Sequence, residues 1–270
     1  TETSSLLRLA AVGNDEDLAA LAHVEKRLNG ICSPILKFER TDELLAGRDT
    51  FDAVVVLSGS GDINEVAKVL AGADKHLLVE ASLLNSIEDA SNLRSVFEQS
   101  TATLVASFRQ RHHAAVKTVQ SIHDSGKLGR PGLLRIHSWS PLRSADHQLT
   151  AMIDLACWLF QSSPTTVRAT RQSFGSEAEG TNVHLGFPNN GMALIDVSGG
   201  ASFGADYFTL SVIGSDGAAY ADDHHDAQLV IRDNHQLAVT ASDRSLPILS
   251  QVQDFLDRVA GHQTVSIQVR

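Results

Sequence analysis

Several apolar stretches of the sequence run directly into a residue that can do polar chemistry. The run HLLV leads into Glu80, DAVVVL leads into Ser58, and ATLVASF leads into Arg109. A carboxylate, a hydroxyl and a guanidinium at such positions can accept a hydrogen bond, contact a ligand backbone or hold a small anion. His147 adds a side chain that titrates near neutral pH. Whether these residues form one site depends on the elements that carry them.

The first half of the chain alternates short apolar runs with amphipathic stretches. Strands are predicted at LLRLAAV, ILKF, DAVVVL, HLLVE and ATLVASF, with helices between them, and Thr41 and Ser86 are predicted to cap two of the helices. Such apolar runs alternating with helices indicate a parallel sheet with right-handed crossovers. Residues 1–107 are therefore expected to form a shortened Rossmann-like α/β domain, whose ligand crevice lies at the carboxyl ends of the strands.

After residue 108 the pattern changes. A helix over HAAVKTVQSIHDSGKLG is followed by strand-like alternation in GLLRIHSWS, ALIDVSGG, YFTLSVIGSDGAAYAD and AQLVIRD, separated by turn signals. Two further helices are predicted at QLTAMIDLACWLFQ and LPILSQVQDFLDRVAG. Residues 108–270 are therefore expected to form an α+β domain with an open-faced, mostly antiparallel sheet packed on helices.

Composition restricts the possible functions. A formal net charge of −10 argues against binding to nucleic acid, because phosphate contacts are dominated by Lys and Arg. Cys32 and Cys157 are widely spaced among apolar residues, which favours free thiols in a reducing compartment. No run approaches the ~18 apolar residues that span a bilayer. These features predict a cytoplasmic protein without a membrane contact.

Five stretches occur in the order and at the spacing of a known family. They are FDAVVVLSGSG, VLAGADKHLLVEASLLNSIEDASNL, SIHDSGKLGRPGLLRIHS, AMIDLACWLF and SVIGSDGAAYADD, and together they cover most of residues 52–270. This arrangement resembles the glucose-fructose oxidoreductase and inositol dehydrogenase family of NAD(P)-dependent enzymes. The resemblance implies a dinucleotide in the first domain and a second domain whose open sheet face often forms oligomer contacts.

The resemblance also identifies two altered catalytic positions. Family members typically end the fourth strand in Glu-Lys-Pro, where the lysine assists proton transfer, whereas this chain reads Glu80-Ala81-Ser82. A family motif of Asp and His one helical turn apart falls on His147 and Ala151. Alanine has no titratable proton, so neither Ala81 nor Ala151 can act as a general acid or base.

The expected cofactor site is altered as well. A Rossmann fingerprint needs glycines between the first strand and helix, so that backbone N–H groups approach a pyrophosphate. Here the turn is Gly13-Asn14 followed by Asp15-Glu16-Asp17. Acids in the first turn stabilise a helix by ~0.3–1 kcal/mol each but repel a pyrophosphate. No cofactor is therefore expected, and NAD or NADP only if the protein is active. The candidate cofactor-binding residues are Gly13, Asn14, Ser58 and Glu80.

The segment between Val12 and Asp52 is shorter than the family usually has. It has room for a helix, a short strand and a short helix, so a strand and a helix are expected to be missing. The missing strand normally ends in the acid that holds the cofactor ribose. Glu39 and Asp42 stand near a strand end, but FERTDELL is interpreted as a loop and a helix start. The shortened sheet could expose an edge for a partner subunit.

Other polar clusters have simpler interpretations. Arg109 or Arg111 could hold a small anion, although a solvent-facing helix start is the favoured interpretation. His147 could contact a substrate or lie at the surface. The DDHHD cluster at residues 222–226 is interpreted as a turn and no metal site is expected, because successive strand side chains alternate faces. Arg109 and His147 are the candidate substrate-binding residues, and no catalytic residue is identified.

Three functions follow from these residues. The leading hypothesis is a family member that has kept the two-domain fold, has lost hydride transfer and acts as a binding, regulatory or assembly protein. The alternative is an active NAD(P)-dependent dehydrogenase of a sugar, polyol or related hydroxyl compound, with Glu80, His147 or Arg109 handling protons. A third is a small-molecule sensor. The expected partners are a small molecule in the cleft between the domains and a second copy bound through the second-domain sheet.

Overall fold

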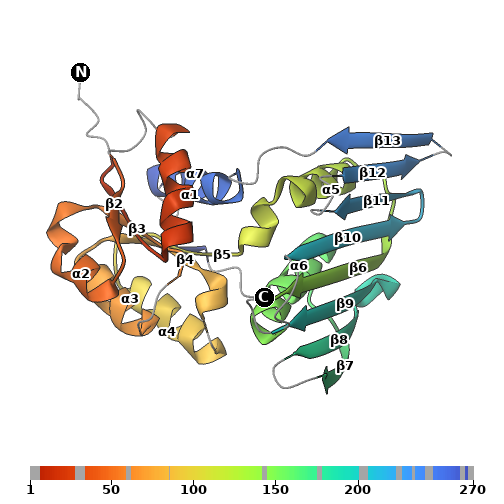
Figure 1. Cartoon of the computed structure of the whole chain (residues 1–270), viewed down its shortest axis with the longest axis horizontal. Helices are drawn as coiled ribbons and strands as arrows, with labels where there is room; N and C mark the ends of the chain where they lie inside the picture. Colours follow the sequence, from red (N-terminus) through yellow and green to blue (C-terminus); the bar gives the residue numbers. More distant parts are fainter. Residues whose placement is uncertain are drawn as a thin grey trace. The chain divides into compact units, whose positions relative to one another are not determined.

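The chain divides into two compact units (Figure 1). The first unit comprises Thr1–Arg109 and Ser245–Val269, and the second comprises Gln110–Arg244 and Arg270. The predicted boundary assigned all of residues 108–270 to the second domain. In the structure, the last helix and the last strand, within Ser245–Val269, belong to the first unit. The computed structural model describes residues 7–27, 34–58, 62–84, 86–141, 145–174, 178–200, 206–222, 227–232, 235–240, 246–261 and 265–266.

The first unit is built on a parallel sheet with the strand order β14-β5-β4-β3-β1-β2. Its strands are β1 (Leu9–Val12), β2 (Leu36–Phe38), β3 (Ala53–Val56), β4 (His76–Glu80), β5 (Leu104–Ser107) and β14 (Val265–Ser266). Its α-helices are α1 (Asp15–Arg27), α2 (Thr41–Ala46), α3 (Ile63–Gly72), α4 (Ile87–Phe97) and α7 (Leu246–Ala260), with 3-10 turns at Arg48–Thr50, Ala81–Leu83 and Arg109–His112.

Two apolar clusters hold the helices on the two faces of this sheet. On one face, α7 inserts Val252, Phe255 and Leu256 against strand residues, together with Leu21 of α1. On the other face, α2, α3 and α4 pack against alternate residues of the same strands. Because both faces are covered, β1 and β3 are buried along their whole length, as their continuous apolar runs predicted.

The two predicted helix caps differ in outcome. Ser86 caps α4 as predicted, with its hydroxyl accepting a hydrogen bond from the Asp89 amide at 3.0 Å. The prediction for Thr41 is wrong, because Thr41 is the first residue of α2 and the cap position is Arg40. The Arg40 side chain binds Asp42 in the first turn of α2 rather than the helix amides.

The second unit contains a mixed sheet of order β13-β12-β11-β10-β6-β9-β8-β7. Its strands are β6 (Pro131–Ser140), β7 (Thr166–Ser173), β8 (Glu179–Gly186), β9 (Met192–Gly199), β10 (Tyr207–Gly214), β11 (Gly217–Asp222), β12 (Ala227–Arg232) and β13 (His235–Thr240). β6 pairs with β9 in parallel, and the other pairs are antiparallel. Helices α5 (Ala114–Asp124) and α6 (Ala145–Phe160) and a 3-10 turn at Pro188–Asn190 complete the unit.

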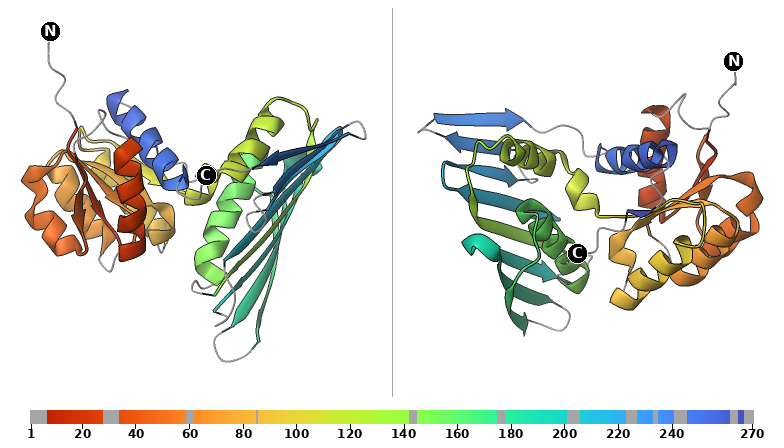
Figure 2. Two further views of the ribbon diagram at one scale, coloured as in Figure 1. Left: turned by 45° about the horizontal axis from the view of Figure 1, so that its top comes forward. Right: turned by 180° about the vertical axis from the view of Figure 1, so that it is seen from behind.

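Both helices of the second unit lie on one face of its sheet (Figure 2). α6 packs on β6, β8 and β9, and α5 packs on β11 and β12. The covered face of β6 carries buried Leu134 and Ile136, while Arg135 and His137 alternate with them on the open face. These two architectures confirm the predicted fold class: a shortened Rossmann-like parallel sheet and an α+β domain with an open-faced, mostly antiparallel sheet.

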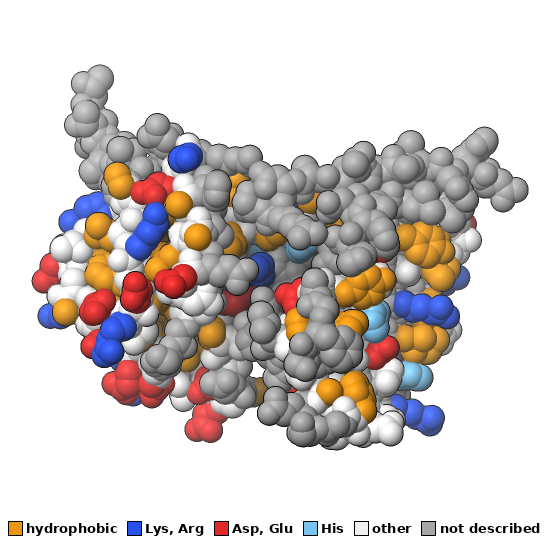
Figure 3. All heavy atoms as spheres, in the orientation of Figure 1, with side chains coloured by type: hydrophobic (Ala, Val, Ile, Leu, Met, Phe, Trp, Pro, Cys, Tyr) orange, Lys and Arg blue, Asp and Glu red, His pale blue; other side chains and the backbone are white. Residues whose placement is uncertain are grey.

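No helix in the described part of the chain is long and apolar enough to cross a membrane. Charged side chains of both signs are interspersed over the visible face of the first unit (Figure 3). That face shows no basic stripe of the kind that tracks a nucleic-acid backbone.

Candidate functional site

The strand register brings the predicted cofactor residues to one edge of the first sheet. Val12 of β1 pairs with Phe38 of β2 and Val56 of β3, so the residues after these three strands are neighbours. Glu80 at the end of β4 pairs with Ser107 at the end of β5. Ligands of open α/β sheets bind outside these carboxyl ends. This edge is therefore the candidate site of the first unit.

Asn14 and Ser58 are joined directly at this edge. The Asn14 backbone N–H donates to the Ser58 hydroxyl at 2.8 Å, and the Asn14 carbonyl accepts from the Leu18 amide at 2.9 Å, the first hydrogen bond of α1. An amide in this turn is a group that would approach a pyrophosphate. In this chain a protein hydroxyl already satisfies it.

The turn also departs from the glycine pattern at its second position. In G-x-G-x-x-G the second glycine lets the backbone approach the pyrophosphate, and the third allows close packing of the helix on the strand. Gly13 occupies the first position, Asp15 the second and Leu18 the third. Asp15 is exposed and is the first residue of α1. Asp15 therefore places a side chain and a negative charge at a position where the fingerprint has a glycine.

The predicted absence of a ribose-binding strand is corrected by the structure. β2 pairs in parallel with β1, and Glu39 follows its last residue, Phe38, directly. The strand that the short sequence omits would lie beyond β2, so the strand normally followed by the ribose acid is retained. Glu39 is exposed and no described residue bonds its carboxylate. The sequence signal was the position of Glu39 immediately after the strand ILKF. We had interpreted the segment FERTDELL, which contains Glu39, as a loop and a helix start.

Glu80 is buried at this edge and bound by its neighbours. Its side chain is 6% exposed, its Oε1 accepts the Arg109 backbone N–H at 3.2 Å, and its Oε2 accepts from Gln251 Nε2 at 3.0 Å. The Arg109 Nε lies 3.8 Å from Oε2. Gln251 belongs to α7, which is 171 residues away in sequence, so sequence reasoning had no signal for this contact. These contacts hold Glu80 as a fixed acceptor between β4 and α7.

Buried methyl groups stand at both positions where the resemblance implies a proton-transfer residue. Ala81 begins the turn after β4 and is 4% exposed, and Ala151 in the second turn of α6 is 3% exposed. Neither side chain offers a hydrogen-bond donor or acceptor.

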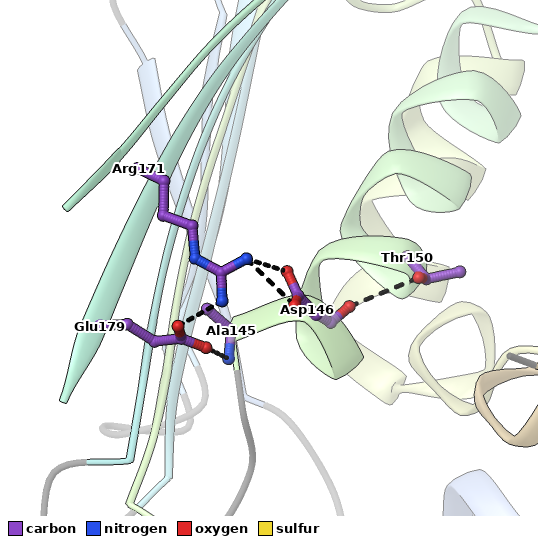
Figure 4. A network of polar contacts seen from close by, with 5 residues as sticks. All are labelled: Ala145, Asp146, Thr150, Arg171 and Glu179. Carbon is purple, nitrogen blue, oxygen red and sulfur yellow. Dashed lines mark hydrogen bonds and ion pairs between the residues drawn. The ribbon is translucent and has the colours of Figure 1, made fainter. Parts of the chain in front are cut away.

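His147 and Ala151 lie on one stripe of α6, four residues apart, and Asp154 continues that stripe one turn further on. The His147 side chain lies outside the described part of the structure. The first turn that carries it is fixed to the sheet edge (Figure 4). Arg171 of β7 donates to both oxygens of Asp146 at 3.0 and 3.1 Å and also bonds Glu179 of β8.

Glu179 completes this network at the start of α6. Its second carboxylate oxygen accepts the Ala145 backbone N–H at 3.3 Å, which satisfies an amide at the helix start (Figure 4). The network therefore fixes the beginning of α6 on β7 and β8. Arg171 was not identified from the sequence, because nothing in TVRATRQS distinguishes it from Arg168.

Arg111 makes a buried ion pair in the second unit rather than an open anion site. It donates through Nε to Asp154 at 2.7 Å, a second bond joins the same two groups, and its guanidinium lies 5.5 Å from the Trp158 ring centroid. Burial raises the pKa of Asp154, and the Arg111 partner opposes that shift. Burial, followed by the nearby Asp154 charge, raises the pKa of the free Cys157 thiol, which keeps it protonated.

No group of three or more metal-ligating side chains occurs among the described residues. Of the DDHHD cluster, Asp222 ends β11, and residues 223–226 lie outside the described part. Gly59, Ser60 and Gly61 of the predicted nucleotide contact lie outside it too.

Comparisons with known proteins agree with this fold. No family model matches the chain. It is 28% identical over 189 residues to an uncharacterized oxidoreductase, YrbE, of Bacillus subtilis, covering 63% of this chain and 55% of that protein. It is 25% identical over 200 residues to myo-inositol 2-dehydrogenase of Thermotoga maritima, covering 67% of this chain and 60% of that protein. The chain thus spans little more than half the length of these relatives.

Among solved structures, levoglucosan dehydrogenase in complex with NADH and L-sorbose superposes with a TM-score of 0.78 at 14% identity. The match covers 98% of this chain and 92% of that one. This likeness shows that the chain shares the two-unit fold of that enzyme. In sequence order and in fold, the chain is similar to oxidoreductases of the glucose-fructose oxidoreductase and inositol dehydrogenase type.

The residues of the first unit match a nicotinamide dinucleotide only in part. Glu39 stands where an acid would accept hydrogen bonds from ribose hydroxyls. The Asn14–Ser58 bond and Asp15 do not fit a diphosphate, because one amide is already satisfied and the nearest side chain is negative. A whole dinucleotide therefore does not fit these residues as they stand.

Proposed function

We propose that this protein keeps the family fold without the family's hydride transfer and acts as a binding, regulatory or assembly protein. The observation that carries the proposal is the pair of buried methyl groups at Ala81 and Ala151. By resemblance, these two positions hold the lysine and the histidine that handle protons in the family.

The size of the loss supports this proposal. A positioned general acid or base contributes about 10²- to 10⁴-fold to a rate, and this chain has lost two such groups. The neighbouring polar groups offer no simple replacement. Glu80 is held by Gln251 and Arg109, and Arg111 is held by Asp154.

A hydride-transfer assay tests the proposal. The purified chain is incubated with NAD⁺ or NADP⁺ and a panel of sugars and polyols, and NADH or NADPH formation is followed by absorbance. We expect no turnover above that of the Ala81→Gly variant, which changes the same position without adding a proton carrier. Steady turnover that saturates with one substrate would sink the proposal.

The alternative function is an active NAD(P)-dependent dehydrogenase of a sugar, polyol or related hydroxyl compound. The names of the relatives favour it, since one is a myo-inositol 2-dehydrogenase and another a D-xylose 1-dehydrogenase. Glu80, His147 or Arg109 would then supply the proton chemistry. Turnover in the assay above that is lost in His147→Ala would establish this alternative.

We further propose self-association through the open face of the second-unit sheet, in a cytoplasmic setting. Met192 and Ile213 are 42% and 36% exposed on strands β9 and β10, and the free Cys157 thiol suits a reducing compartment. Light scattering coupled to size exclusion should show a dimer or larger assembly for the wild type. The Ile213→Arg variant should be smaller, and an unchanged mass would contradict this interface.

A further inference from the structure

Three strand ends form a small platform at the edge of the first sheet. The pairs Val12–Phe38 and Val12–Val56 place Gly13, Glu39 and Leu57 side by side as the next residues of their strands. The Leu57 amide donates to the Val12 carbonyl at 3.1 Å, which extends the pairing to the point where Ser58 begins. Any ligand on this platform contacts the turn after β1 and the residue after β2 together.

The Ser58 hydroxyl already accepts the hydrogen bond of the backbone amide that a phosphate would use. Its hydroxyl accepts the Asn14 N–H at 2.8 Å, and it reaches that amide from the neighbouring strand end rather than from the turn itself. A phosphate oxygen could bind this amide only by displacing the hydroxyl, so most of the gain from the new bond would be cancelled.

Asp15 adds a charge of the wrong sign for a phosphate. It is exposed at the first residue of α1, in the place where the fingerprint has its second glycine. Its carboxylate is stabilised by the positive end of the helix dipole, which a phosphate would otherwise use. A diphosphate there would meet repulsion in place of attraction.

Glu39 offers the opposite kind of contact. An ionised carboxylate accepts hydrogen bonds and donates none, so it suits a ligand that brings hydroxyl donors. The adjacent cation does not offset this preference, because Arg40 donates to both oxygens of Asp42 at 2.9 and 2.8 Å. The platform thus combines an acceptor for hydroxyls with two features that disfavour phosphate.

We propose that Asp15 and Ser58 are specificity-determining residues that exclude diphosphate-bearing ligands from this platform. The ligand class that remains is an uncharged compound with vicinal hydroxyls, of nucleoside type, whose diol is held by Glu39. The inference rests on the proposed binding function and specifies its ligand.

Calorimetric titration of the full chain with adenosine and ADP tests the inference, because the two probes share the diol and differ in charge. The wild type should bind adenosine at least about tenfold more tightly than ADP. In the Asp15→Asn/Ser58→Ala variant the ADP affinity should rise by about tenfold, since one repulsion and one competing bond are removed. The adenosine affinity should stay within about twofold.

A matched variant controls for general charge and hydroxyl loss. Glu88 and Ser91 are an acid in the first turn of α4 and a serine one turn later, whose hydroxyl bonds the Ile87 carbonyl. Glu88→Gln/Ser91→Ala should leave both affinities at the wild-type value. The Glu39→Gln variant should weaken adenosine binding by about tenfold without improving ADP binding.

The results that would contradict this inference differ from the result that would contradict the proposed function. Wild-type ADP binding equal to adenosine binding, or a folded double variant without ADP gain, would overturn the exclusion by Asp15 and Ser58. Absence of adenosine binding at millimolar concentrations would overturn the ligand class. Failure of the proposed function is instead seen as NADH or NADPH formation by the wild type, which the titration does not measure.

Discussion

The interior of the first unit and the carboxyl edge of its sheet differ in how far each retains the family pattern. The interior is continuous: Leu9, Val55 and Leu78 are fully buried and pack against α7 on one face, with α3 and α4 on the other. The edge has Asp15, Ser58 and Ala81 at positions where the resemblance to the family implies a glycine, an open amide and a lysine.

This difference separates the determinants of fold from those of activity. Apolar strands packed on both faces fix the sheet whatever residues follow them, because burial is non-directional and proportional to area. A catalytic site depends on single side chains at the strand ends, and these can be replaced without changing the packing. Fold and activity can therefore diverge within one domain.

The largest expected effect is in the interior. Phe255 of α7 is fully buried, so Phe255→Ala should lower the free energy of unfolding by about 3–5 kcal/mol. Denaturant unfolding measures this loss. Phe174→Ala, at a residue that is 51% exposed, should cost under about 1 kcal/mol. Equal losses for the two variants would contradict the account, because the cost would then not depend on burial.

The buried ion pair of the second unit should come next. Arg111→Ala leaves Asp154 buried without its partner and should cost about 3 kcal/mol at pH 7. Because burial raises the pKa of Asp154 and the variant loses the opposing guanidinium, the carboxylate is penalised only above its unfolded value of 3.8. The deficit should therefore shrink as the pH falls from 7 toward 4. A deficit that grows on acidification would contradict this account.

A smaller loss is expected at the boundary between interior and edge. Gln251→Ala removes the amide that donates to Glu80 and should cost about 2 kcal/mol, because the acceptor is a buried carboxylate. Gln253 on the same helix makes the same type of bond to exposed Asp257 at 2.8 Å and serves as the matched control. Gln253→Ala should cost under about 0.5 kcal/mol, and thermal unfolding of both variants measures the contrast.

The smallest effect is expected at the exposed network of Figure 4. Arg171 is 48% exposed and Asp146 64% exposed, so Arg171→Ala should cost much less than Arg111→Ala in spite of its several bonds. Arg40→Ala, at a fully exposed pair, should be neutral. A loss for Arg171→Ala as large as that for Arg111→Ala would show that α6 depends on its first turn as much as on its buried middle.

Sequence patterns predicted most of the first unit and less of the second. Continuous apolar runs identified β1 to β5, and helical spacing identified α3, α5, α6 and α7. Strands β7, β8 and β13 were not predicted. All eight residues of β7 are exposed, so this strand carries no alternation. The return of α7 to the first sheet could not be predicted either, since an amphipathic helix does not specify which sheet its apolar face covers.

The candidate site was predictable only in its composition. The sequence showed which residues follow the strands, and it showed Ala81 and Ala151 without a titratable group. It could not show that Ser58 reaches across to the Asn14 amide, because that bond depends on the register of β1 and β3. Glu39 was misinterpreted because the sequence did not show that the short strand before it pairs directly with β1.

The central claim is that a diphosphate cannot dock where Asp15 and Ser58 stand. Titration of the wild-type chain with NADH, followed by the change in NADH fluorescence, tests it most directly. The account predicts no saturable binding at micromolar concentrations. A saturating signal in that range, competed by ADP, would contradict it.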